Sequence, residues 1–455
     1  MIIMFGMSIT ACEDFVEISV PNDKIVSSAV FENDDTAKSA MTGIYNELFN
    51  ATFSGGWSHS ITVLADLSAD VLQPINPESP TYGELYQNDI SPGNALSHNL
   101  WSSAYSIIYM VNSLLEGLDG SKGLSTETKN RLEGEARFVR AFTYFYLTNI
   151  YGDVPLVLNT DYRSNSLVPR TGSEEVEVQI FSDLERAMGL LETGYLEGER
   201  THVNKYVVMA FLARVHLYHQ HWSEAETWSS AVLSQTSIYG ILVDLNQVFL
   251  ANSQEAIWQI SPIGRGNIIT ATNEGQAFIG TSRSAIKLAE GFVESLSAND
   301  KRLSNWIGHF TNPTRNFYYP YKYKDRSSIR NITEYSMVLR LAEQYLIRAE
   351  ARAMQGKLPG AISDVDKIKV RAGLLPIAEI DPGIGREALL KVIMEERKKE
   401  FFAEWGHRWF DLKRTTTAME VLQPIKGQWK NTSLLYPVPE EERMKNPNLD
   451  QNEGY

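Results

Sequence analysis

Several long segments of this sequence repeat their apolar residues every three or four positions, the spacing of one face of an α-helix. The clearest are residues 36–49, 98–118 and 135–151. The third is apolar on nearly all sides, which predicts a helix packed between two layers, and Gly152 and Pro155 are expected to end it. The chain is therefore predicted to be mostly α-helical.

Two later segments resemble one another. Residues 206–233 and 339–370 each predict a helix, a short turn and a second helix, with small residues such as Ala213 and Ala361 where the two helices would cross. These are the requirements of a tetratricopeptide-type hairpin. We expect an all-α fold, in which such hairpins form a right-handed scaffold with long irregular insertions that carry the binding loops.

The remaining regions lack this periodicity. Residues from about 50 to 97 and from about 260 to 331 are longer than ordinary connections, so we interpret them as functional insertions. The proline-containing segment 434–455 is unsuited to a central strand and is expected to lie extended along the helices as a strap.

Charge and cysteine content exclude several classes of protein. The 455 residues include 42 Lys and Arg against 56 Asp and Glu, a net charge of −14, whereas nucleic acids and anionic lipids require a basic face. The single cysteine, Cys12, excludes internal disulfides and cysteine-based zinc or iron–sulfur sites.

The surroundings of Cys12 suggest a modification. The apolar run before it ends in Ala11 and resembles the cleavage box of bacterial lipoproteins, in which the cysteine is lipidated and becomes the first mature residue. Ile9 and Thr10 depart from that pattern, and a hydrophobic N-terminus with an unmodified cysteine is the alternative. We expect a truncated signal segment at 1–11, one domain at 12–455, and a lipid anchor instead of a membrane span.

No enzyme motif is evident. The sequence contains no P-loop, nucleophile elbow, His-Glu-x-x-His or dinucleotide fingerprint. A cluster of His216, His219 and His221 could bind a metal, although packing at a hairpin turn is the simpler interpretation. Glu396 and Glu400 lie among large aromatic residues, where a buried ion-pair network is expected and a general acid is the alternative. We predict no catalytic residue, metal or cofactor.

Four ordered blocks resemble the SusD-like (RagB/SusD) family of Bacteroidetes outer-membrane nutrient-uptake lipoproteins. They are residues 135–157, 339–352, 395–414, and 435–440 together with the chain end 446–455. The resemblance implies a cell-surface protein, lipid-anchored at Cys12 in the outer membrane, that binds glycans through aromatic residues in its loops. It also implies that the protein hands oligosaccharides or polysaccharides to a SusC-like TonB-dependent transporter.

The insertions contain aromatic side chains next to amides and carboxylates, which match the apolar faces and polar rims of sugar rings. The candidate glycan-binding residues are Trp57, Asp66, Tyr82, Tyr86, Asn88, Trp306, Tyr318, Tyr319 and Tyr321. Local packing is the alternative for each aromatic ring, and a helical-repeat scaffold for protein–protein contacts without sugar binding is the alternative function.

One part of the second insertion is rich in basic residues. Between residues 300 and 330, Asp300 and Asp325 are outnumbered by Lys301, Arg302, Arg315, Lys322, Lys324, Arg326 and Arg330. This excess is compatible with an anionic glycan such as a uronate polymer, with an acidic transporter surface, or with ordinary surface ion pairs.

Overall fold

The computed structural model describes residues 30–262, 270–329, 331–427 and 429–455. Cys12, the predicted signal segment and Arg330 lie outside these residues. The longer helices are α2 (Asp34–Asn50), α3 (Ile61–Ser68), α5 (Ala95–Gly120), α6 (Thr126–Tyr151), α8 (Ser173–Leu190), α9 (Lys205–Tyr218), α10 (Trp222–Leu233), α14 (Leu341–Met354), α15 (Leu358–Arg371), α17 (Arg386–Phe401) and α18 (His407–Arg414).

The other elements are short. The short α-helices are α4 (Gly83–Gln87), α7 (Tyr162–Asn165), α11 (Asn273–Phe278), α12 (Glu290–Glu294), α13 (Lys301–Asn305), α16 (Ile377–Ile380), α19 (Ala418–Leu422) and α20 (Glu440–Lys445), and the 3-10 helices are η2 (Leu196–Gly198), η3 (Leu245–Gln247) and η5 (Asn431–Leu434). The strands are β1 (Leu72–Pro74), β2 (Ala256–Ile260), β3 (Ile286–Leu288), β4 (Ile307–Asn312), β5 (Arg315–Pro320) and β6 (Ser336–Arg340).

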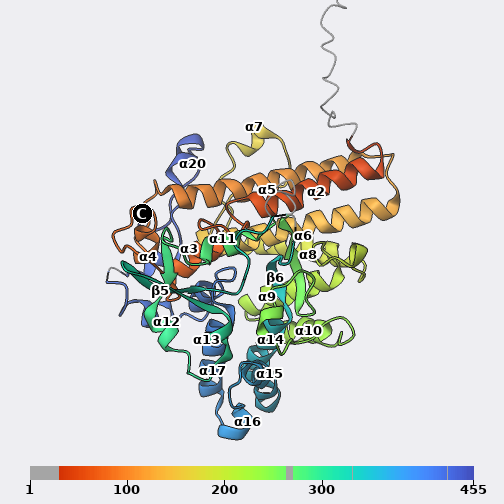
Figure 1. Ribbon diagram of the computed structural model, residues 1–455. Coiled ribbons are helices and arrows are strands. Elements are labelled where there is room, and N and C mark those ends of the chain that lie inside the picture. Colours follow the sequence, from red (N-terminus) through yellow and green to blue (C-terminus); the bar gives the residue numbers. More distant parts are fainter. Residues whose placement is uncertain (1–29, 263–269, 330, 428) are drawn as a thin grey trace, which may run out of the picture.

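Three long helices, α2, α5 and α6, pack on one another along one side of the molecule (Figure 1). The side chains of Asn33, Asn94 and Ser125 accept hydrogen bonds from backbone N–H groups at the start of each helix, which satisfies donors that the helix leaves unpaired. Gly152 follows the last residue of α6 with φ 74°. The three predicted helices are confirmed, and α6 begins nine residues earlier than its apolar run.

The hairpins are also confirmed. Helix α9 packs on α10, α14 packs on α15, and α10 contacts α14, so the two hairpins form one stack (Figure 1). Leu339 and Arg340, predicted to be helical, instead end strand β6. They pair with Trp258 and Ala256 of β2, and this pairing outweighs the local helical pattern.

The two insertions are more regular than predicted. In the first, every residue of α3 is buried, so the helix shows no polar face and its sequence lacks the alternation that reveals a helix. The second insertion contains α11, α12, α13 and three short strands. Strand β1 of the first insertion pairs with β3 of the second, with Leu72 opposite Leu288 and Pro74 opposite Ile286. The two insertions are thus joined to each other.

The chain end packs across the end of α6. The amide of Asn452 donates to the backbone oxygens of Tyr151 and Tyr436 at 2.8 and 2.7 Å. The hydroxyl of Tyr436 lies 2.7 Å from that of Ser68 and donates to the Leu64 oxygen. The segment includes the short helix α20.

The expected ion-pair network is present and buried. Glu400 accepts hydrogen bonds from Arg302, Arg340 and Arg371, and Glu396 accepts one from Arg302 at 2.6 Å. Burial opposes ionisation of Glu400, but the three arginines outweigh it and hold the pKa of this carboxyl below its ordinary value. These glutamates are held in ion pairs inside the molecule, which removes the basis for a general-acid role.

None of the helices in the described part of the chain combines the length and the apolar composition needed to cross a lipid bilayer.

Candidate functional site

A surface groove of about 570 Å³ lies where the two insertions meet. We call it the Trp57 groove. It is lined by Trp57, Ser58, Tyr82, Gln276, Ala277, Ile279, Thr281, Arg283, Ser284, Ala285, Ile286, Arg326, Ser327 and Ile329. The pairing of β1 with β3 brings these two parts of the sequence together, because Ile286 belongs to both the strand and the groove.

Two glycines determine how Trp57 is presented. A Cβ atom on Gly55 would lie 2.4 Å from the backbone oxygen of Phe49. Gly56 has φ +75°, and a Cβ atom there would lie 2.2 Å from the carboxyl carbon of Glu274. The turn therefore packs directly on Glu274 and requires glycine at both positions. It leaves the Trp57 side chain partly exposed at the groove.

Residues at the start of helix α11 contact and hydrogen-bond this turn. The side-chain amide of Asn273 donates to the backbone oxygens of Phe49 and Gly55 at 3.0 and 2.6 Å. Glu274 is buried and accepts a hydrogen bond from the Ser336 hydroxyl, while its second oxygen has no partner among the described residues. Burial raises the pKa of Glu274 to about 7.

The remaining walls combine an aromatic ring with polar groups. Tyr82 is only 5% exposed, stacks with His59 at 6.2 Å between ring centroids, and has its pKa raised by burial. Gln276 lines the groove, and its amide nitrogen is buried without a hydrogen-bond partner in the described part of the chain. Such an unpaired buried donor is uncommon in folded proteins.

Of the predicted glycan-binding residues, the structure brings Trp57 and Tyr82 together. Tyr318, Tyr319 and Tyr321 lie on or just after strand β5 and do not line the groove. Tyr318 is 41% exposed and packs on His309, while Tyr319 covers Gly280, which lies between two lining residues. The β4–β5 hairpin thus flanks the groove.

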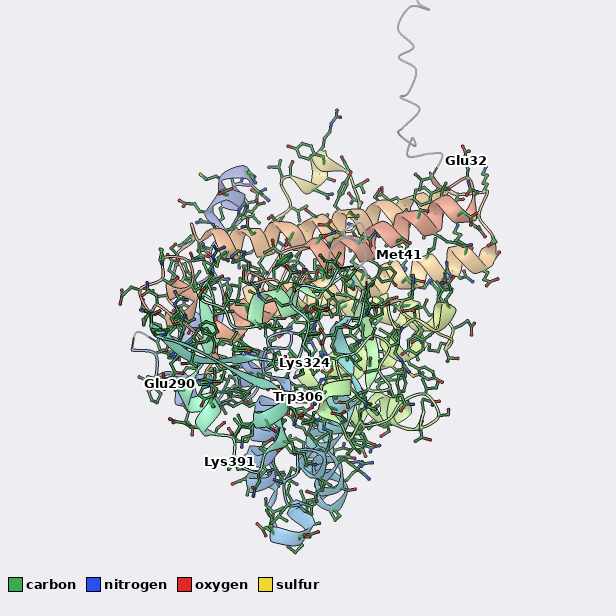
Figure 2. The ribbon with its side chains drawn as sticks, viewed as in Figure 1. Glu32, Met41, Glu290, Trp306, Lys324 and Lys391 are labelled. Atoms are coloured by element: carbon green, nitrogen blue, oxygen red, sulfur yellow. The ribbon has the colours of Figure 1, made fainter. Side chains whose placement is uncertain are left out.

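The structure corrects the assignment of the other candidates. Trp306 is fully buried in the interior of the molecule (Figure 2), and its indole nitrogen donates to the Leu245 oxygen at 3.0 Å. Asp66 is buried, accepts from the Ala403 N–H at 2.7 Å, and has its pKa raised by burial to about 8. Asn88 is buried in the left-handed turn that ends α4. These three side chains do not reach the groove.

Tyr86 lies elsewhere as well. It is half-buried, and the Lys426 ammonium lies 5.0 Å from the centre of its ring. Spacing along the chain could not separate these residues from Trp57, because their burial depends on helices that are distant in the sequence.

The basic segment 300–330 divides in a similar way. Arg302 and Lys322 belong to the buried ion pairs, and Lys324 donates to the backbone oxygens of Asn305 and Tyr321. The ion-pair interpretation therefore holds for Arg302 and Lys322, although these pairs are buried and not at the surface. Arg326 alone among the described basic residues of this segment lines the groove.

Most of the lining residues were not among the predicted glycan-binding residues, and two of them, Arg283 and Gln276, have side chains suited to polar contacts with a ligand. Both lie outside the aromatic-rich stretches of the sequence. The available signal was an isolated arginine between small polar residues at 281–284.

The histidine cluster packs around an aromatic ring. His216 and His221 approach at 3.2 Å between Nδ1 atoms, His219 pairs with Glu177 at 2.9 Å, and all three lie against Phe181. Burial lowers the pKa of both His216 and His219 to about 4. Among the residues that the structure describes, no group of three or more His, Cys, Asp or Glu is arranged to hold a metal ion.

Comparison with known proteins gives consistent matches over nearly the whole chain. A model described as the SusD family matches residues 270–455, and one described as starch-binding associating with outer membrane matches residues 72–217. SusD-like protein P25 of Formosa agariphila is 24% identical over 519 residues, which cover 98% of this chain and 97% of the relative.

Solved structures share the fold. A SusD superfamily protein from Bacteroides vulgatus has a TM-score of 0.80 at 20% identity, with 93% of this chain and 99% of that chain covered. A laminarin-binding SusD-like protein also has a TM-score of 0.80 at 20% identity, with 93% and 100% covered.

Proposed function

The chain belongs to the SusD-like family, and on that premise we propose that it binds oligosaccharides or polysaccharides in the Trp57 groove. The observation that carries the proposal is the partly exposed Trp57 ring, held by a turn that requires two glycines and faced by further polar and aromatic walls. The face of an indole ring suits the C–H face of a sugar, and lining hydroxyl groups such as those of Ser58 and Ser327 can bind its polar rim. Binding of this kind changes no covalent bond.

We extend the proposal to location and partner. Lipidation at Cys12 would anchor the protein at the cell surface in the outer membrane, and a SusC-like TonB-dependent transporter would receive the bound glycan. The lipoprotein-like residues before Cys12 and the outer-membrane association named in the family description support this step. Metabolic labelling with a fatty-acid analogue should modify the full chain and should be lost in Cys12→Ser, and copurification of a transporter from the native membrane tests the partner.

Isothermal titration against a panel of neutral and anionic polysaccharides tests the central proposal. Replacing Trp57 with alanine should weaken binding roughly tenfold or more, because the ring supplies both apolar area and a stacking face. The melting temperature should change little, since the side chain is partly exposed. Tyr162→Ala removes an 81% exposed ring from α7 and serves as the matched control, with affinity unchanged.

Tyr318→Ala asks separately whether the flanking hairpin contributes to binding of longer chains. Failure of the folded protein to bind any member of the panel would overturn the proposal and favour a scaffold for protein–protein contacts.

A further inference from the structure

We propose that the Trp57 groove selects anionic saccharides, with the guanidinium groups of Arg283 and Arg326 binding carboxylate or sulfate substituents. The inference rests on the proposed glycan-binding function and specifies its substrate class. Among the described residues, Arg283 and Arg326 are the charged side chains that line the groove, and neither Asp nor Glu lines it. In a chain of net charge −14, a lining whose described charges are all positive is not the expected composition.

Both guanidinium groups are available. Arg283 and Arg326 are exposed, and neither makes a side-chain hydrogen bond or an ion pair with another described residue. Other arginines of this protein, such as Arg302 and Arg340, have several carboxylate partners. A planar guanidinium with free N–H groups can bind a carboxylate or a sulfate through two parallel hydrogen bonds.

The carboxylates near Arg326 in the sequence accept hydrogen bonds from backbone N–H groups. Asp325 accepts hydrogen bonds from the N–H groups of Ser327 and Ser328 at 3.0 and 2.9 Å, which fixes the turn that carries Arg326. Glu334 accepts from the N–H groups of Lys324 and Asp325. Glu274, beneath the Trp57 turn, is buried, and burial raises its pKa to about 7. Neither Asp325 nor Glu334 forms an ion pair with Arg283 or Arg326 in the described part of the chain.

A third cationic side chain, that of Arg315, adds positive charge next to the groove. Arg315 of β5 donates to the backbone oxygen of Ser284 at 2.9 Å, one residue from Arg283. Its charge therefore lies beside the groove, although the residue does not line it.

Two other grooves of the protein are lined by residues of both charge signs. The groove of about 660 Å³ beside α14, α17 and α18 combines Lys391, Arg408 and Arg414 with Glu350, Glu395, Asp411 and Glu420. A groove beside Trp101 and Tyr162 contains Glu442 and Lys445, which form an ion pair at 2.7 Å. Compared with these two grooves, the Trp57 groove differs in that its described charged lining residues are all arginines.

Two matched pairs of ligands test the inference. The first is trigalacturonate and its neutral methyl ester, and the second is a sulfated galactan oligosaccharide and its desulfated form. Titration calorimetry should show at least about tenfold tighter binding of one or both anionic members, with affinity that falls as sodium chloride is raised. The two pairs distinguish carboxylate from sulfate recognition.

Substitutions locate the effect. Arg283→Gln and Arg326→Gln should each weaken binding of the preferred anionic ligand by roughly tenfold and leave its neutral counterpart unaffected, while the lysine variants retain part of the affinity. Arg386→Gln removes one exposed positive charge at the start of α17, outside the groove, and controls for overall charge. Melting temperatures verify that each variant is folded.

The outcomes separate the two proposals. Equal or tighter binding of the neutral members, still lost in Trp57→Ala, would overturn the anionic preference and keep the glycan-binding function. Anionic preference that persists in both glutamine variants would also overturn the assignment to these arginines. Binding of no saccharide by the folded protein would overturn the proposed function itself.

Discussion

Glu274 links the stability of the protein to the turn that presents Trp57. Its carboxyl group lies directly against Gly56, so the uncharged form packs there at little cost and the charged form is buried with one oxygen unpaired in the described structure. Burial raises its pKa to about 7, above the ordinary value of 4.5. A carboxyl whose pKa is raised by folding stabilises the folded state at low pH and loses that contribution as pH rises through the raised value.

Glu274→Gln should therefore flatten the dependence of stability on pH. Below about pH 4.5 the wild-type carboxyl is protonated in both states, whereas above about pH 7 it is charged in both. Across this interval the free energy of unfolding of the wild type should fall by up to about 3 kcal/mol more than that of the variant, from a shift of 4.5 to about 7. Chemical denaturation at a series of pH values measures this difference.

Glu290→Gln is the matched control, because Glu290 lies at the edge of the molecule with 77% of its side chain exposed (Figure 2). Its pH dependence should follow the wild type. Parallel curves for Glu274→Gln and the wild type would contradict the buried, raised-pKa assignment.

At the scale of residues, the sequence predicted whether a side chain lies at the site only where its immediate neighbours in the chain determine its exposure. Trp57 directly follows Gly55 and Gly56 in the sequence, and these two glycines shape the turn that presents it. Trp306 has equally suitable neighbours in the sequence, yet it is enclosed by Phe249, Phe402 and the buried cations. Its environment comes from elements far away along the chain, so no local pattern could have revealed it.

At the scale of elements, the α9–α10 and α14–α15 hairpins have the same turn geometry. The N–H of His221 donates to the oxygen of His216 at 2.9 Å, and the N–H of Lys357 donates to that of Arg352 at 2.8 Å. Each bond joins residues five positions apart, the pattern of a right-handed helix that ends with one residue in the left-handed conformation. The left-handed position holds Gly356 in one hairpin, with φ +77°, and Gln220 in the other, with φ +59°.

Gln220→Gly should stabilise the protein by about 1 kcal/mol, because glycine adopts a positive φ without the steric cost of a side chain. Gly356→Gln should destabilise it by a similar amount, and the space around Gly356 is open, so the backbone alone accounts for the loss. Chemical denaturation measures both variants. Gln423, with φ −56°, provides the control, since glycine there should bring no gain. A stabilising Gln423→Gly would point to a cause other than the sign of φ.

Helices were the most predictable elements, and the reason is physical. Helices α2 and α5 each bury one face and expose the other, so the helical period is visible in the sequence. Helix α3 is buried on all sides, so its sequence shows no polar face. Strands β1 and β3 contain three residues each, too few to show the alternation of a strand. The insertions that carry the candidate site are therefore the parts that the sequence described least well.

At the scale of the whole molecule, the buried ion pairs join the second insertion to the helical scaffold. Arg302 comes from α13 in the insertion, Arg340 from β6 and Arg371 from α15, and all three donate to Glu400 of α17. Arg340 and Arg371 both also bind Glu255, just before β2. The Glu400 carboxylate thus connects helix α17 with α13, β6 and α15.

Glu400→Gln should cost about 3–5 kcal/mol of unfolding free energy, because it leaves buried guanidinium groups without their shared counter-charge. Guanidinium-induced unfolding measures the loss, and limited proteolysis between residues 260 and 331 should show faster cleavage if the insertion loosens first. Glu387→Gln on the same helix is the control, since Glu387 is exposed and belongs to no ion pair in the described structure, so its stability should change little. If both variants lose equally little, the network stabilises the fold no more than surface charges do, and another contact must position the insertion that contributes Arg283 and Arg326 to the groove.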